Sequence, residues 1–170
     1  MRFRRHLFII KRMEQRLPTR RDLERLAAWA ELHRADGTVR AELSRRLEAE
    51  AQTTLLEHEA VHRLVLAPGR RLTMNQLADA LLVSRSGATR LIDRLEARGW
   101  VARRTAPHDR RIVRAELTRE GAAAFAHVGP VFAAAFEERF GGVLDDAEVA
   151  ELRRVLAKLL AASPGPVRGA

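Results

Sequence analysis

The chain has 170 residues and a mass of 19.1 kDa, a length that suits one domain with an appended dimer interface. It has no cysteine, which excludes disulfides, thiol catalysis and zinc-thiolate sites, and no apolar run of about 18 residues, which excludes a membrane-spanning helix. Lys and Arg number 31 against 22 Asp and Glu, a net charge of +9 that is typical of proteins that meet phosphate or a membrane surface. We expect a soluble, cytoplasmic protein without a metal or cofactor.

The positive charge is concentrated in two segments. Residues 1–21 carry eight cations and one acidic residue, and residues 84–114 carry nine arginines and three acidic residues. Residues 22–83 and 115–170 each sum to −2. A slightly acidic body with local basic segments is the charge pattern of a nucleic-acid-binding protein.

The first basic segment, residues 1–18, has two interpretations. Met13 is an alternative start, in which case the first twelve residues are upstream sequence. Otherwise the segment is a basic extension that touches the DNA backbone or packs against a partner chain. Both this extension and the tail 163–170 are expected to be disordered.

A long helix is expected from residue 19 to about residue 50. Thr19 and Asp22 approximate a capping box, and apolar residues then recur at helical spacing. Gly37 is a weak interior position, with a cost of about 1 kcal/mol relative to alanine. The helix is longer than a compact core needs, so we expect part of it to meet a partner chain.

Three shorter helices follow. The first covers about residues 54–66, and the second begins with a capping box of Thr73 and Gln76. The third is capped by Ser84 and stopped by Gly99. Its apolar positions recur at i, i+3, i+4 and i+7, which predicts a buried stripe of Ala88, Leu91, Ile92 and Leu95.

The opposite face of the third helix is short, polar and cationic. This composition suits the major groove of B-DNA, where base edges can be told apart. In isolation, the arginines could equally form a solvated helix face. The candidate DNA-contacting residues are Ser84 (also the cap), Arg85, Ser86, Thr89, Arg90 and Arg94.

A basic hairpin is expected next, from strands at residues 100–105 and 111–117. Arg110 and Arg111 are placed to reach a flanking minor groove, whose negative potential attracts arginine. Asp109 could hold one of these guanidinium groups in a fixed pose.

Two further helices complete the pattern. One runs from Thr118 to about residue 140, with an interruption near residues 129–130, and the last runs from residue 145 to before Ser163.

The order helix, turn, helix, glycine and basic hairpin is that of a winged helix-turn-helix. The predicted fold class is mainly α (α+β). Residues 53–117 form the DNA-binding domain, and residues 19–52 and 118–162 form flanking N- and C-terminal helices for dimerisation.

Residues 72–121, LTMNQLADALLVSRSGATRLIDRLEARGWVARRTAPHDRRIVRAELTREG, closely resemble the multiple antibiotic resistance regulator (MarR) family. The strongest parts are SRSGATRLIDRLEARGWV, DRR at 109–111 and LTREG at 117–121, and the likeness extends over roughly residues 20–162. It implies a homodimer that presents one recognition helix and one wing per protomer to a palindromic operator on double-stranded DNA. It also implies release by a small aromatic or anionic effector. In the family's wing motif an Asp fixes the Arg that enters the minor groove, and these positions are Asp109 and Arg111 here.

The segment from His58 to His62 matches the zinc-protease motif H-E-x-x-H. The chain has little room for a third ligand and a substrate cleft, and the family resemblance implies an aromatic residue followed by Glu in this helix. The preferred interpretation is histidines without a metal. The alternatives are a metal-sensing regulator that uses His58 or His62 with His33 or His127, and, with the weaker support, a zinc hydrolase.

The effector is expected in a crevice between the helical region and the winged unit. Trp29, His33, His58 and His62 are candidates to line it, although Trp29 is more simply a core or interface residue. The sequence therefore predicts a dimeric, ligand-responsive repressor that is not an enzyme. A winged-helix module that mainly binds protein is the remaining class.

Overall fold

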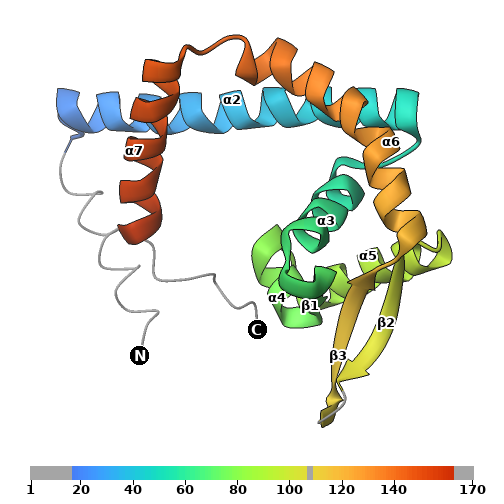
Figure 1. The fold of residues 1–170 in the computed structure, drawn as a ribbon. Helices are drawn as coiled ribbons and strands as arrows, with labels where there is room; N and C mark the ends of the chain where they lie inside the picture. The colour runs from blue at the N-terminus through green and yellow to red at the C-terminus, as the bar shows by residue number, and fades with distance from the viewer. Residues whose placement is uncertain (1–16, 107–108, 163–170) are drawn as a thin grey trace, which may run out of the picture. The chain divides into compact units, whose positions relative to one another are not determined.

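The computed structural model of the chain describes residues 17–106 and 109–162 (Figure 1). The predicted basic extension with Met13 and the predicted tail from Ser163 lie outside the described residues. The chain divides into two compact units between Val39 and Arg40. The elements are α2 (Arg20–Ala51), α3 (Leu55–Leu66), the 3-10 turn η1 (Pro68–Arg70), β1 (Arg71–Thr73), α4 (Met74–Leu81), α5 (Arg85–Ala97), β2 (Val101–Ala106), β3 (Asp109–Leu117), α6 (Arg119–Phe136), the π turn η2 (Glu137–Gly141) and α7 (Asp146–Ala162).

The helix starts follow from side-chain caps. Capping boxes join Thr54 to Glu57 at α3 and Thr73 to Gln76 at α4, and the Ser84 hydroxyl accepts a bond from the backbone N–H at the third position of α5. Each cap satisfies N–H groups that have no partner inside the helix, a contribution of about 1 kcal/mol. Leu82, with φ of 55°, makes the left-handed turn between α4 and α5. The predicted starts and the turn between these helices are confirmed.

The core of the second unit lies between the three short helices and the sheet. It contains the predicted α5 stripe together with side chains of α3, α4, β2 and β3. The fully buried apolar residues include Leu64, Leu77, Leu91, Ile92, Leu95 and Val101. Each such side chain contributes about 1.5–3 kcal/mol when it is removed from water, so the core fixes one face of α5 and leaves the other outside.

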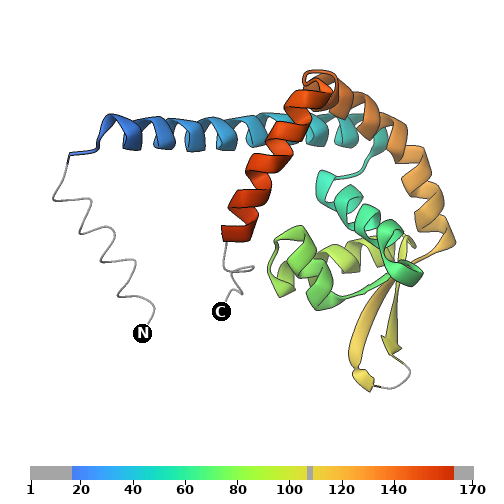
Figure 2. The ribbon, with the colours of Figure 1, turned by 60° about the vertical axis from the view of Figure 1, so that its left-hand side comes forward.

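The sheet is antiparallel, with the order β1-β3-β2. β2 and β3 form the predicted hairpin, which extends away from α4 and α5 in both views (Figures 1 and 2). The short strand β1 pairs Thr73 with Arg114 and was not predicted, because three residues are too few for a recognisable alternation.

The predicted interruption of the fifth helix near residues 129–130 is wrong. α6 continues through Pro130 to Phe136. A proline normally forces the preceding residue out of helical geometry through a clash with its Cβ, and Gly129 has no Cβ. Burial of Val128 and Ala135 on either side stabilises the helix across the proline.

None of the helices in residues 17–106 and 109–162 combines the length and the apolar character that a membrane crossing requires.

Candidate nucleic-acid interface

The exposed face of α5 begins at its cap. The Ser84 hydroxyl accepts a hydrogen bond from the Gly87 N–H at 3.0 Å and lies 3.0 Å from the Ser86 hydroxyl. The Thr89 hydroxyl donates to the carbonyl of Arg85 at 3.0 Å. The side chains of this part of α5 and its cap are exposed, and they present a row of polar groups. These residues are Ser84, Arg85, Ser86 and Thr89.

Arg85 and Arg90 are the free cations of this face. Both are exposed, and within the described part of the chain neither guanidinium has an ion pair or a side-chain hydrogen bond. A guanidinium without a protein partner can bind phosphate or the O6 and N7 acceptors of guanine. These two predicted residues are thus exposed and unpaired within the described residues, and their contact with DNA stays a prediction.

Arg94 lies on the same helix but is engaged within the protein. Its Nε donates to Glu57 of α3 at 3.4 Å and its Nη1 donates to the Arg90 carbonyl at 3.5 Å. About half of its side chain is exposed. Of the predicted α5 arginines, it is the one whose charge already has a partner.

Arg103 of β2 ties the hairpin to α5. It pairs with Asp93 at 2.6 Å and with Glu96 at 2.7 Å, and it donates to the Thr89 carbonyl at 3.2 Å. The arginine that pairs with Asp93 therefore comes from the strand and not from its own helix. Sequence reasoning missed Arg103, although alternation places it on the same strand face as the buried Val101, where a cation needs an acidic partner.

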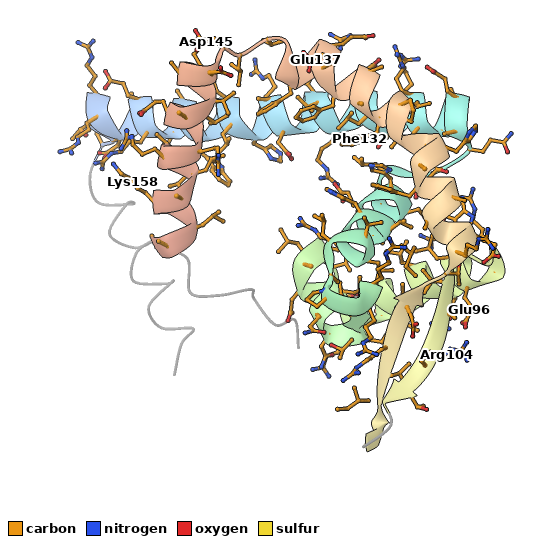
Figure 3. All side chains as sticks on the ribbon, viewed as in Figure 1. Glu96, Arg104, Phe132, Glu137, Asp145 and Lys158 are labelled. Atoms are coloured by element: carbon orange, nitrogen blue, oxygen red, sulfur yellow. The ribbon has the colours of Figure 1, made fainter. Side chains whose placement is uncertain are left out.

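The middle of the hairpin carries two more arginines. Arg104 of β2 lies directly opposite Arg114 of β3, so both side chains are on the same face of the sheet. Neither has an ion pair within the described residues, and Arg104 is exposed (Figure 3). Like charges directly opposite each other are destabilising, and a bound anion would relieve that repulsion.

The predicted wing-tip residues lie at the start of β3. Asp109 pairs by its backbone with Ala106, after a register shift in the hairpin. The side chains of Asp109, Arg110 and Arg111 lie outside the described part of the structure, so their role in the minor groove stays a prediction.

His58 is part of an aromatic stack between α3 and α6. It is 4% exposed, with its ring 4.3 Å from Phe132 (Figure 3) and 5.2 Å from Phe125, both measured between centroids. Burial, and secondarily the charge of His62, lowers the pKa of His58 to about 4. The imidazole is therefore neutral near pH 7, and it packs like the aromatic residue that the resemblance implies at this position.

The remaining members of the H-E-x-x-H motif also have structural surroundings. Glu59, the general base of such a motif, pairs with Arg40 at 3.0 Å, and the ring of the exposed His62 lies 5.8 Å from Phe125. Among the described residues no group of three or more His, Asp or Glu side chains could hold a metal ion.

The other two predicted effector residues, Trp29 and His33, lie on α2. Trp29 is 66% exposed, and its interpretation as a core or interface residue stays a prediction. Their grouping with His58 and His62 around one effector stays a prediction.

The comparisons with known proteins agree on one family. The model of the MarR family matches residues 51–112. A segment of 47 residues is 47% identical to the transcriptional repressor MprA of Escherichia coli K12, and it spans 28% of this chain and only 27% of that relative.

Solved structures match over a larger part of the chain. The DNA complex of Sco3205, a MarR family transcriptional regulator from Streptomyces coelicolor, is 28% identical with a TM-score of 0.74, covering 84% of this chain and 96% of that one. AbsC, a second such regulator from the same organism, is 25% identical with a TM-score of 0.75, covering 87% and 99%. Residues 51–112 thus match the MarR family, and the chain has the winged-helix fold of MarR family regulators.

Proposed function

We propose that this protein is a transcriptional repressor that binds a palindromic operator on double-stranded DNA as a homodimer. The observation that carries the proposal is the exposed face of α5, on which Arg85 and Arg90 are unpaired within the described residues beside a basic hairpin. A helix with this face fits the major groove, and the hairpin reaches the adjacent minor groove through Arg110 and Arg111.

The relatives support both parts of this proposal. The Sco3205 structure is a complex with DNA, and MprA is a transcriptional repressor. In this proposal the protein acts in the cytoplasm, and the bound dimer represses transcription by covering a promoter. A small aromatic or anionic effector would relieve it by holding the two recognition helices at a spacing that does not match half-sites about 34 Å apart.

Exposed apolar side chains on α2 and α7 support the homodimer. Leu23, Leu26 and Trp29 are between 51% and 66% exposed on α2, and Leu160 is 75% exposed on α7. An apolar stripe of this extent on a helix marks an interaction surface. We assign dimerisation to residues 19–52 and 118–162 and DNA binding to residues 53–117.

The test is binding of the full-length protein to labelled duplexes by fluorescence anisotropy over a range of salt concentrations. The probes are a duplex selected from random sequence by the parent protein and a scrambled duplex of the same composition. We expect preference for the selected duplex and a steep loss of affinity with salt, because arginine contacts release counterions from phosphate. An isotherm that does not change with salt, or equal binding of both duplexes, contradicts the proposal.

Arg90→Ala is expected to weaken binding to the selected duplex by about 1–3 kcal/mol, or about 5- to 150-fold, and to relax the preference at one base pair. The reason is the loss of an unpaired guanidinium from the exposed face of α5, which we propose contacts the base edges. The measurement is affinity for single-base-pair variants of the selected duplex. Arg153→Ala, the same charge change on an exposed residue of α7, is the control. If Arg90→Ala discriminates among the variants as the parent does, Arg90 does not read a base.

Arg103→Ala is expected to weaken binding by about tenfold. It frees the hairpin from α5 and exposes the carboxylates of Asp93 and Glu96 to phosphate, each exposed pair being worth about 0.2–1 kcal/mol. The matched variant Arg104→Ala removes the same charge from the next residue without a contact to α5, and its loss should be smaller. Addition of Asp93→Asn and Glu96→Gln to Arg103→Ala should recover part of the affinity. Equal losses for Arg103→Ala and Arg104→Ala would show that the contacts to α5 have no role in binding.

A further inference from the structure

We propose that Glu57 determines which arginines of the DNA-binding domain, residues 53–117, are available to DNA. Its buried carboxylate holds Arg94 and Arg98 against α3, and Arg85 and Arg90 remain as the free cations of α5. This inference rests on the proposed DNA-binding function and assigns Glu57 as a positioning residue for it.

The carboxylate of Glu57 is the common partner of three donors. Its side chain is 7% exposed. One oxygen accepts from Nε of Arg94 at 3.4 Å, and the other accepts from Nη1 of Arg98 at 3.3 Å and from the backbone N–H of Thr54 at 3.0 Å. A carboxylate this deeply buried is costly without such partners, so the two arginines compensate its charge.

Arg98 is fixed from three directions. Besides Glu57, it donates to the carbonyl of Gln52 at 3.1 Å, and its guanidinium carbon lies 3.7 Å from the centre of the Trp100 ring. A cation over an indole face gains about 0.5–1 kcal/mol even at an exposed site. Arg98 therefore belongs to the junction between α3 and the end of α5.

Arg94 is held less tightly. About half of its side chain is exposed, and Glu57 supplies its only ion pair among the described residues. Its helix also carries Arg90, one turn nearer the N-terminus, with no acidic partner in the same part of the structure. The difference in availability between these neighbouring arginines is thus due to Glu57.

The charge of Glu57 can be separated from its role as a cap. A capping box needs only an oxygen acceptor at the third helical position, and at α4 a glutamine meets that need, with the Gln76 Oε1 accepting from the Thr73 N–H at 2.8 Å. Glu57→Gln therefore keeps the cap of α3 and the side-chain shape, and removes the charge that retains the two arginines.

The experiment compares Glu57→Gln with the parent in the anisotropy assay on the selected and scrambled duplexes. We expect the slope of log affinity against log salt to steepen by about one, since each added phosphate contact contributes about 0.9. Binding to the scrambled duplex should strengthen, and preference for the selected duplex should fall about tenfold. Glu59→Gln is the matched control, because the adjacent carboxylate undergoes the same charge change but pairs with Arg40 of α2. Glu59→Gln should keep the parent slope.

Two further variants keep the inference falsifiable if Glu57→Gln is poorly folded. Arg94→Gln alone should leave the salt slope of the parent unchanged, because a withheld arginine makes no phosphate contact. Glu57→Gln with Arg94→Gln should return the slope to the parent value. A shallower slope for Arg94→Gln, or a parent-like slope for folded Glu57→Gln, overturns the inference. Failure of the proposed function is a different result, in which the parent itself shows neither salt dependence nor preference between duplexes.

Discussion

Replacing Gly121 with alanine is expected to destabilise the folded chain by about 3 kcal/mol, at the upper end of the cost of overpacking a core. Gly121 lies in the first turn of α6 and is buried. A Cβ there would overlap the carbonyl oxygen of Trp100 and lie 2.8 Å from Cδ1 of Leu117. The carbonyl cannot move aside easily, because it accepts the backbone bond of Thr118 at 3.1 Å. α6 can therefore approach the end of the sheet this closely only because residue 121 has no Cβ.

Chemical unfolding at fixed protein concentration measures this effect. Gly37→Ala in α2 is the control, because a Cβ at that position meets no atom within 4 Å. Glycine in a helix interior costs about 0.5–1 kcal/mol relative to alanine, so this control should be slightly more stable than the parent. If Gly121→Ala unfolds at the same denaturant concentration as the parent, the close approach of α6 to Trp100 does not limit stability.

Local rules account for most of the fold that the sequence predicted. Ser84 and the pair Thr73 and Gln76 identify helix starts because their side chains bond within three residues, and Gly99 ends α5 with a φ of 72°. The apolar stripe of α5 follows from a single helical period. Features of this kind need no knowledge of distant partners.

The features that sequence reasoning missed depend on contacts between distant segments. Arg94 appears free on a helical face, but its partner Glu57 lies 37 residues earlier. The partners of Arg103 come from another element, and β1 exists only because β3 is available to pair with it. The sequence therefore sufficed to propose a candidate site on α5, whereas the division of its arginines into free and engaged required the tertiary structure.

His58 shows the same limitation for a motif. H-E-x-x-H specifies side chains on one helical face but not what covers that face. Here α6 covers it with Phe125 and Phe132, and Nδ1 of His58 is buried without a hydrogen-bond partner within the described residues. His58, which the motif would use as a metal ligand, is instead a buried packing contact. Its burial makes the stability of the folded chain depend on pH.

Acidification is expected to destabilise the folded chain through His58. Burial lowers the pKa of His58 to about 4 in the folded state, whereas the unfolded chain has the ordinary value of 6.5. Above pH 6.5 both states are neutral and no stability is lost. Between pH 6.5 and about 4 the unfolded state binds a proton that the folded state does not, so stability falls as pH falls, by at most about 2 kcal/mol at pH 5. Below about pH 4 both states are protonated and this contribution levels off.

The test is the difference in unfolding free energy between the parent and His58→Phe, measured from pH 7.5 to pH 4.5. Phenylalanine keeps the stack with Phe125 and Phe132 and removes the titrating, unpartnered nitrogen. The variant should be at least as stable as the parent at pH 7.5, and its advantage should grow by about 2 kcal/mol on reaching pH 5. Carboxylates that titrate in the same range affect both proteins alike and cancel in the difference. His127→Phe, at an exposed position of α6, should keep the pH dependence of the parent. A difference between parent and His58→Phe that is constant with pH would mean that the imidazole can bind its proton without leaving the stack.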